Sequence, residues 1–257
     1  MTKYGWRPGV PDQRDLKLQC SWPLFKKLPA SLSLRNQLPP VWNQHGLGAC
    51  TAFSTLATWY HLKGQQIAGK LDDDTNIFKP SFLFQYYNTR KIENTVEFDS
   101  GATIGDAFKA LQKYGACPES IWPYSEKAFA TLPPKNSYEK ASSSQLLKYF
   151  RLAGSLRSVK ACLADGYIIA AGFSVYDSFE DPNGVTKTGI MTMPGPKESL
   201  LGGHAITIIG FNDKKKALEV RNSWGDSFGD SGHFWMPYDI FNKQGMISDF
   251  YSPRLVE

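Results

Sequence analysis

Residues 44–54, QHGLGACTAFS, decide the fold, because a glycine-punctuated loop there leads directly into a helical pattern. Apolar side chains then recur at i, i+3, i+4 and i+7, the spacing of one helix face, at Phe53, Leu56, Ala57 and Tyr60. We expect a largely buried helix from about Ala49. Cys50 would lie at its first turn, where unpaired N–H groups and the macrodipole lower a thiol pKa. A lone cysteine is also commonly an inert core residue, so its position leaves both interpretations open.

Two stretches in the second half of the chain supply the partners that a nucleophilic thiol needs. His204 lies in the segment GGHA that enters an apolar strand pattern, and Asn222 opens the segment NSWG that ends the next one. A thiol nucleophile requires a base or cationic partner, which in turn requires a group that fixes its orientation. Cys50, His204 and Asn222, in that order, can supply all three functions.

Composition excludes several other classes of protein. The 257 residues are 42% hydrophobic with a net charge of +5, which is typical of a globular chain and not of a disordered or collagen-like one. The longest apolar runs, residues 167–173 and 205–210, are far shorter than the roughly 18 residues of a membrane span. Lys and Arg are dispersed apart from residues 214–216, so we expect no nucleic-acid partner and no membrane partner.

The cysteines and acidic residues predict no metal site. Four widely spaced cysteines fit neither paired zinc ligands nor a disulfide-dense scaffold: Cys20, Cys50, Cys117 and Cys162. Cys20, Cys117 and Cys162 either stay as thiols, or two of them form one disulfide that the sequence does not identify. Residues 72–74, DDD, lack the alternating ligands of a calcium loop and are expected to form a solvated loop.

Secondary-structure patterns divide the chain into two halves. Helices are predicted over residues 81–90, capped by Ser81, and over residues 104–114, ending at Gly115. Strands are predicted over three segments of the second half, residues 167–175, 205–209 and 218–222. A helical first half and a β-rich second half indicate an α+β fold with two lobes, and sites preferentially form in the cleft between lobes.

The ordered set of motifs resembles the papain-like (C1) cysteine peptidases. Residues 44–54, 203–205 and 222–225 are similar to the three signature blocks of that family, residues 28–35 to the start of its mature enzymes, and residues 122–124 to its Tyr-Pro-Tyr segment. The likeness is greatest to the bacterial branch, through three further segments: residues 5–15, 99–102 and 188–204.

The resemblance implies a papain-like two-lobed fold. It would place a helical lobe at about residues 45–140, a β-sheet or barrel-like lobe at about residues 150–257, and the active-site cleft between them. Residues 28–257 would form the peptidase domain, and residues 1–27 an N-terminal arm.

The resemblance also implies roles for individual residues. Cys50 would be the nucleophile, His204 its imidazolium partner and later the acid for the leaving amine, and Asn222 the group that orients His204. Gln44 would act with the Cys50 N–H as the oxyanion hole. The substrate backbone would run antiparallel to residues 101–102. The residues that would bind substrate are Gly48, Gly101, Ala102, Gly203 and Trp224. The pair is expected to be a thiolate and an imidazolium, with the thiol pKa near 3 to 4 as in papain.

The implied activity is hydrolysis of peptide bonds through an acyl-enzyme by a monomer without cofactor. One alternative is a papain-like module that binds peptides without activity, which the intact Cys50, His204, Asn222 and Gln44 disfavour. Another is acyl transfer to an amine, as in a transpeptidase, a branch that generally orients its histidine with Asp. Thr51 replaces the family's usual Trp, and the family's disulfide-forming cysteine before the nucleophile is absent. An insertion within residues 181–201 would explain the long spacing from Cys50 to His204.

The arm admits two interpretations. Its glycines and prolines favour an extended chain, and its apolar anchors are Trp6, Val10, Trp22, Leu24 and Phe25. It either restrains the peptidase by covering the cleft or packs on the lobes as a structural belt. Because the sequence shows neither a large helical pro-region nor a signal peptide, we expect restraint by the arm, narrow specificity, or export, and we favour an exported over a cytoplasmic enzyme.

Overall fold

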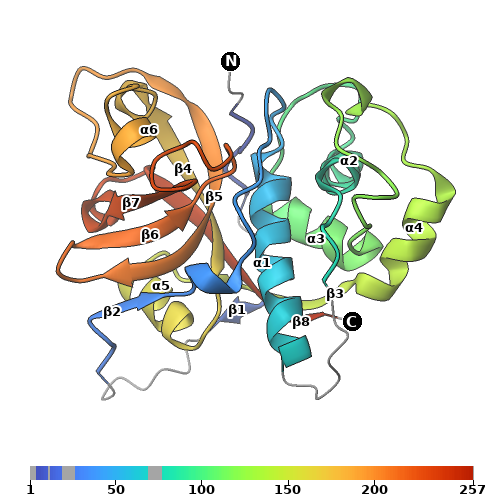
Figure 1. Ribbon diagram of the computed structural model, residues 1–257, viewed down its shortest axis with the longest axis horizontal. Helices are drawn as coiled ribbons and strands as arrows, with labels where there is room; N and C mark the ends of the chain where they lie inside the picture. Colours follow the sequence, from blue (N-terminus) through green and yellow to red (C-terminus); the bar gives the residue numbers. More distant parts are fainter. Residues whose placement is uncertain (1–3, 11, 19–26, 69–76, 257) are drawn as a thin grey trace.

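The computed structural model describes residues 4–10, 12–18, 27–68 and 77–256. Helix α1 (Cys50–Ala68) runs through the middle of the molecule, with a helical part on one side and a β-rich part on the other (Figure 1). The helical part contains α2 (Phe82–Ile92), α3 (Ile104–Tyr114) and α4 (Lys135–Ala141). The predicted α+β fold, with helices first and strands later, is confirmed.

Helix α1 is buried on nearly all sides over its first three turns, because it packs against both α2 and the sheet. Leu56 and Trp59 are fully buried. The ring of Phe53 stacks on Phe82 of α2 with centroids 3.9 Å apart, and Trp42 packs on the same Phe82 ring at 4.8 Å. These apolar contacts fix the beginning of α1 relative to the helical part of the molecule.

The other two predicted helices begin and end as their local signals indicate. The Ser81 hydroxyl accepts a hydrogen bond from the Phe84 N–H, so it caps α2 as predicted. The Thr103 hydroxyl likewise accepts from the Asp106 N–H at the start of α3. Gly115 ends α3 at φ +79°, a conformation that glycine adopts without steric cost.

The strands form one mixed sheet in the order β1-β3-β8-β4-β5-β6-β7, with β2 paired to β5. Their bounds are Lys17–Leu18 (β1), Ser31–Ser33 (β2), Leu146–Leu152 (β3), Ile169–Tyr176 (β4), Leu200–Asn212 (β5), Ala217–Arg221 (β6), His233–Pro237 (β7) and Ile247–Val256 (β8). The pairing of β1 with β3 is parallel and the other pairings are antiparallel. Within the described strands the two edge strands, β1 and β7, do not pair, so the sheet is open. The resemblance implied either a sheet or a barrel-like lobe, and the structure has the open sheet.

The core has two main parts that meet along α1 and the sheet. One lies within the β-rich part, around Phe173, Ile208 and Phe234, and includes side chains of α5 (Leu156–Ala164) and α6 (Val185–Thr188). The other joins α1, α2 and α3 to Ala170 and Ala205 of the sheet. The predicted insertion, residues 181–201, contains α6 and an extended return to β5. Among the described helices, none is long and apolar enough to cross a membrane.

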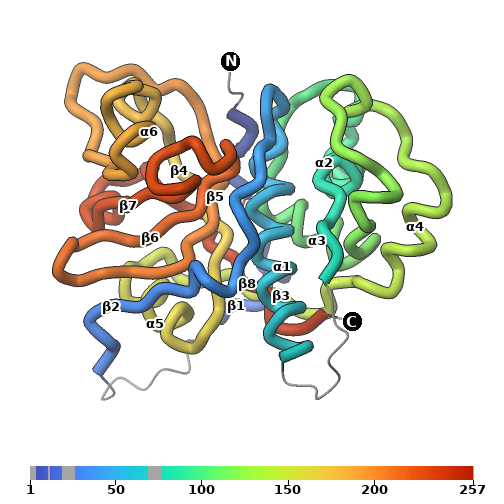
Figure 2. Tube along the Cα trace, in the orientation of Figure 1, coloured from blue at the N-terminus to red at the C-terminus, as the bar shows by residue number. Residues whose placement is uncertain are grey.

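The described part of the N-terminal arm is mostly irregular, as predicted, and its regular structure is the short strand β1. Figure 2 shows its dark-blue trace entering at the top, between the β5 side and the loop that leads to α1. Trp6 is only 5% exposed and anchors the arm. Val10 is 91% exposed, so its prediction as an anchor is wrong: the chain passes over a cavity there instead of packing on a lobe. The remaining predicted anchors, and residues 72–74, lie outside the described residues.

Candidate active site

The thiol of Cys50 lies where the helix meets the sheet. Cys50 is the first residue of α1 and is fully buried, as the sequence predicted for its helix position. Its Sγ accepts a hydrogen bond from the Ala205 N–H at 3.4 Å. Ala205 follows His204 in β5, so this contact brings the thiol to within one residue of the predicted partner, although the two are far apart in the chain.

His204 is oriented by Asn222. The His204 Nε2 lies 2.7 Å from the Asn222 Oδ1, in a buried contact. The Ser223 N–H donates to the same Oδ1 at 2.9 Å, which fixes the amide with its oxygen toward the imidazole. Since an amide oxygen only accepts, Nε2 carries the proton and Nδ1 is the ring's accepting nitrogen. Within the described residues no group hydrogen-bonds to that buried Nδ1.

Aromatic rings enclose this pair. The centroid of the Trp224 ring lies 5.0 Å from that of the His204 ring. The Phe173 ring of β4 meets the same His204 ring edge-on, with centroids 5.9 Å apart. Phe179 in turn packs edge-on against Trp224. The rings exclude water from the His204–Asn222 bond, and a hydrogen bond is electrostatically stronger in such a low-dielectric setting.

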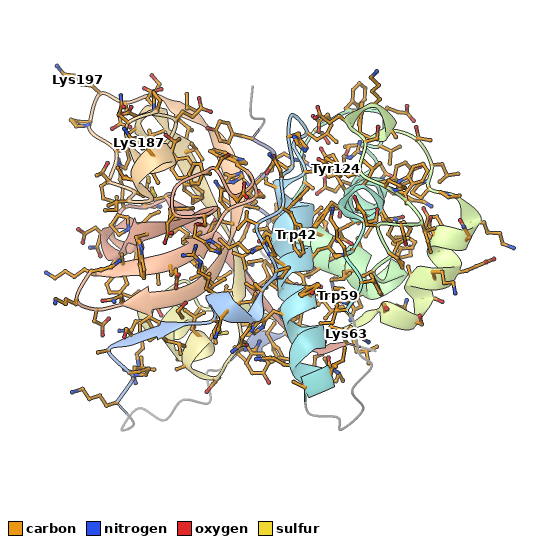
Figure 3. All side chains as sticks on the ribbon, in the orientation of Figure 1. Trp42, Trp59, Lys63, Tyr124, Lys187 and Lys197 are labelled. Atoms are coloured by element: carbon orange, nitrogen blue, oxygen red, sulfur yellow. The ribbon has the colours of Figure 1, made fainter. Side chains whose placement is uncertain are left out.

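Gln44 is tied to the end of β6 that carries Asn222. Its side-chain Oε1 accepts from the Ser223 hydroxyl at 2.6 Å, and its Nε2 donates to the Leu47 carbonyl at 2.8 Å. Its backbone carbonyl accepts from the Tyr124 hydroxyl at 2.7 Å. Figure 3 labels Tyr124 on the helical side and Trp42 in front of α1. Gln44 is therefore a fixed, buried amide in the loop that ends at Cys50.

Two residues hold the helical wall of the cleft: Asp99, from the segment 99–102 noted in the sequence, and Tyr86, which the sequence did not single out. The Asp99 carboxylate accepts from the Gly48 N–H at 3.1 Å and from the Tyr86 hydroxyl at 2.5 Å. The Tyr86 hydroxyl accepts from the Gly101 N–H at 3.1 Å. Gly48 and Gly101 are thus fixed through one tyrosine–aspartate pair, which no local pattern could reveal because it joins three separate segments.

The cleft is occupied by the chain's own residues 4–7. The Trp6 N–H donates to the Gly203 carbonyl at 2.9 Å, and the Ala102 N–H donates to the Gly5 carbonyl at 2.7 Å. The Arg7 N–H donates to the Ala102 carbonyl at 3.1 Å. Trp6 therefore pairs in parallel with Ala102, whereas substrate is expected to run antiparallel there.

Contact between the arm and the cleft is close. A Cβ on Gly5 would lie 1.8 Å from the Gly48 carbonyl oxygen, so only glycine fits at that position. A Cβ on Gly101 would lie 2.0 Å from the Gly5 oxygen. The Tyr4 ring lies 6.1 Å from the His204 ring and 6.2 Å from that of Trp224. The residues predicted to bind substrate all lie beside the arm: Gly48, Gly101, Ala102, Gly203 and Trp224.

In this covered form the pair is neutral. Burial raises the pKa of Cys50 to about 11, although backbone N–H groups, that of Gly5 included, act to lower it. Burial lowers the pKa of His204 to about 4, against the opposing effect of the Asn222 hydrogen bond. The predicted thiolate–imidazolium pair therefore does not describe the arm-covered cleft, because burial without water favours the uncharged forms.

The absorbance of Cys50 tests these shifts without requiring a reagent to reach the buried thiol. Between about pH 4 and pH 11 the covered pair is a thiol and a neutral imidazole. The ultraviolet difference spectrum between the unmodified protein and Cys50→Ala should therefore show no thiolate band between pH 6 and pH 9. A thiolate band at pH 6 to 7 would contradict a neutral pair beneath the arm.

The described residues offer no arrangement for a metal ion, because no three His, Cys, Asp or Glu side chains in them cluster suitably. The other histidines have structural surroundings. His61 contacts the Gln37 side chain, His233 contacts the Ser231 carbonyl, and His45 lies exposed in the loop before α1.

Comparison with known proteins agrees with this arrangement. Residues 91–254 match the family described as papain family cysteine protease. An uncharacterized peptidase C1-like protein of Acanthamoeba polyphaga mimivirus is 37% identical over 217 residues, which cover 81% of this chain and 68% of that protein. Cysteine proteinase 3 of Entamoeba histolytica is 25% identical over 235 residues, which cover 90% of this chain and 70% of that protein.

Solved structures show the same architecture. Xylellain, a cysteine protease from Xylella fastidiosa, superposes with a TM-score of 0.89 at 32% identity and covers 100% of this chain and 97% of its own. A digestive procathepsin L2 proteinase from the larval midgut of Tenebrio molitor has a TM-score of 0.74 at 21% identity, and the match covers 96% of this chain and 76% of that one. This likeness shows the shared fold. The protein is a cysteine-type peptidase. It belongs to the papain family.

Proposed function

We propose that Cys50, His204 and Asn222 carry out peptide-bond hydrolysis. With the arm withdrawn, the Cys50 thiol gives its proton to the His204 Nδ1 and the resulting thiolate attacks the scissile carbonyl carbon. His204 then gives that proton to the leaving amine as the C–N bond breaks. Water then attacks the acyl-enzyme, His204 takes its proton, and the C–S bond breaks to release the acid and restore the pair. The observation that carries this proposal is the buried contact of β5 with the thiol, together with the Asn222 bond to His204.

Gln44 and the Cys50 N–H are proposed to stabilise the oxyanion of the tetrahedral intermediate. The Gln44 amide is held beside the start of α1, because its Nε2 donates to the Leu47 carbonyl. The bond from Ser223 holds the amide in this orientation. Loss of one oxyanion donor typically lowers the rate by about 10²- to 10³-fold.

Hydrolysis is favoured over the two alternatives. A binding module without activity would not need the pairing of His204 with Asn222 or the fixed amide of Gln44. An acyl transferase of the branch considered above would orient its histidine with Asp, and Asn222 occupies that position. Protein or peptide chains are therefore the proposed substrates, with a monomer as the acting unit.

The arm, residues 1–27 as bounded from the sequence, is proposed to restrain the peptidase domain, residues 28–257. Residues 4–7 cover the thiol and occupy the proposed substrate-binding groups. Because they run parallel to residues 101–102, opposite to substrate, they do not present a peptide bond in the orientation for attack. A structural belt would not need its backbone to lie against Gly48 and Gly101.

Two broader assignments are also proposed. The bacterial branch is supported by the likeness to xylellain over the whole chain, although the mimivirus relative has the higher identity over its shorter match. Export remains a prediction: a peptidase that carries its own restraint can be held inactive until it reaches its site of action.

Asn222→Ala should lower kcat more than it raises KM. A positioned acid–base group typically contributes about 10²- to 10⁴-fold, and loss of its orienting bond should remove at least about tenfold of that. Steady-state kinetics on a peptide substrate measure the split. Asn242→Ala, at the exposed end of a short 3-10 helix (Tyr238–Asn242), serves as the control. A change confined to KM would contradict the orienting role.

A further inference from the structure

A tyrosine–aspartate pair joins the loop before the nucleophile to the wall of the cleft that pairs with the arm. The Asp99 Oδ1 accepts hydrogen bonds from the Gly48 N–H at 3.1 Å and from the Tyr86 hydroxyl at 2.5 Å. The Tyr86 hydroxyl in turn accepts from the Gly101 N–H at 3.1 Å. Residues 99–102 contain no cysteine, so a disulfide cannot hold this wall to the loop. Hydrogen bonds through one carboxylate and one hydroxyl connect the two segments instead.

Each end of the pair lies next to a group that the proposed reaction needs. Gly48 is two residues before Cys50, whose N–H is proposed as an oxyanion donor. Gly101 precedes Ala102, whose N–H and carbonyl both bond to the arm and would bond to a substrate backbone after the arm withdraws. The pair therefore connects the oxyanion side of the site to the substrate-binding side.

Glycine at both ends makes such a connection necessary. Glycine has more backbone freedom than any other residue, and Gly101 uses that freedom at φ +67°. The pair packs closely on the other end, where a Cβ on Gly48 would lie 3.2 Å from the Asp99 Oδ1 and 3.5 Å from the Tyr86 hydroxyl oxygen. A misplacement of about 1 Å in a reacting geometry can cost about 10²-fold in rate. Bonds that restrict these two glycines therefore bear directly on catalysis.

A buried arginine holds the pair in place. Arg90 of α2 is fully buried, and its guanidinium carbon lies 4.1 Å from the centroid of the Tyr86 ring. It donates to the Val96 carbonyl at 2.7 Å and to the Phe98 carbonyl at 2.9 Å, in the loop that leads into Asp99. Its positive charge also attracts the Asp99 carboxylate. Because all of these groups lie outside the arm, the pair keeps its supports when the arm leaves the cleft.

We propose that Asp99 and Tyr86 are positioning residues for hydrolysis, which fix the oxyanion donor on one side of the thiol and the substrate-binding backbone on the other. The inference rests on the proposed peptidase function. Both side chains act through backbone amides and not on the reacting atoms. Asp99 holds the loop of the nucleophile, so its loss should mainly lower kcat. Tyr86 holds the wall that pairs with substrate, so its loss should mainly raise KM.

The test of Asp99 measures kcat and KM separately on a short peptide. It uses the full chain with Gly5→Ala, because a Cβ there prevents the arm from lying in the cleft. Asp99→Leu removes both acceptor oxygens at a similar side-chain size and should lower kcat at least about tenfold. Asp99→Asn keeps an Oδ1 that can accept both bonds, so its kcat should stay within about threefold of that of the Gly5→Ala protein. An arm that returned to the cleft would compete with substrate and raise KM, so it would not imitate a loss of kcat.

The test of Tyr86 uses the same background and the same peptide. Tyr86→Phe removes only the hydroxyl, so the Gly101 N–H loses its acceptor. KM should rise at least about fivefold while kcat changes less than about twofold, as expected when binding of substrate and transition state weakens equally. Tyr138→Phe is the matched control. Its hydroxyl donates to the Asn88 side chain of the same helix at 3.0 Å, in a separate hydrophobic cluster, and its loss should leave both constants unchanged.

The outcomes separate this inference from the function on which it rests. An unchanged kcat in Asp99→Leu, or an equal loss in Asp99→Asn, overturns the role of Asp99. A KM in Tyr86→Phe that matches that of Tyr138→Phe overturns the role of Tyr86, and this comparison decides the inference if Asp99→Leu does not fold. Lower thermal stability with both constants unchanged would mean a structural role only and would also overturn it. Failure of the folded Gly5→Ala protein itself to cleave peptides overturns the proposed function instead.

Discussion

Cys50→Ala is expected to lower peptide hydrolysis at least about a thousandfold while the protein stays folded. The change removes one sulfur, which accepts a hydrogen bond from the Ala205 N–H and is also approached by the Gly5 N–H of the arm. It opens little volume, so loss of the nucleophile and not loss of packing should determine the result. Hydrolysis is measured in a protein that also carries Gly5→Ala, because a Cβ at that position prevents the arm from lying in the cleft. Far-ultraviolet circular dichroism and thermal unfolding report the fold.

Cys117→Ala is the matched control for that variant. Cys117 is a second fully buried thiol; it packs with Phe84 and Ala141 in a cluster separate from that of Cys50, and it makes a weak contact with the Pro118 carbonyl. Its substitution removes the same atom from the interior, so activity should persist. Retention of more than about a thousandth of the activity in Cys50→Ala would place the nucleophile elsewhere.

Gly5→Ala is expected to raise kcat/KM at least about tenfold over the unmodified protein. The new Cβ would lie 1.8 Å from the Gly48 carbonyl oxygen, a backbone atom that Asp99 and Tyr86 hold in place through neighbouring bonds. The arm must therefore withdraw, which exposes the thiol and the walls of the cleft. Hydrolysis of a short peptide with initial-rate kinetics measures the change.

Gly9→Ala controls for glycine replacement as such. Its Cβ would meet the nearest atom, Asp249 Oδ2, at 3.5 Å, an ordinary contact, and the Gly9 N–H would remain available to that carboxylate. Activity should stay at the level of the unmodified protein. Equal activity in Gly5→Ala and the unmodified chain, with both folded, would mean that residues 4–7 form a structural belt and do not restrain hydrolysis.

The parts of the fold that local signals specify could be predicted from the sequence. The Ser81 cap, the Gly115 stop and the apolar face of α1 each depend on residues within a few positions of one another. The alternation of β6 and the apolar run of β4 likewise identified these strands. An open sheet rather than a closed barrel depends on which distant strands pair, and the pattern of each strand carries no such information.

The candidate site divides in the same way. Cys50, His204 and Asn222 each lie in a short recognisable motif, so the sequence indicated them before their contacts were visible. The seat of the arm could not be predicted, because Gly5 meets Gly48 and Gly101 only in the folded chain. The hydrogen bond from the Trp6 indole to the Asp249 carboxylate in β8 could not be predicted either, since it joins residues 243 positions apart. The neutral state of Cys50 also followed only from its burial under the arm.

The most direct test of the central claim is labelling with a thiol-directed epoxide, followed by intact-mass and peptide mass spectrometry. The claim is that Cys50 is the nucleophile of a papain-family peptidase whose cleft its own arm covers. It predicts one adduct on Cys50, formed rapidly near pH 6 in Gly5→Ala and at least about tenfold more slowly in the unmodified protein. Absence of an adduct in folded, reduced Gly5→Ala, or an adduct on another cysteine with Cys50 unmodified, would contradict it.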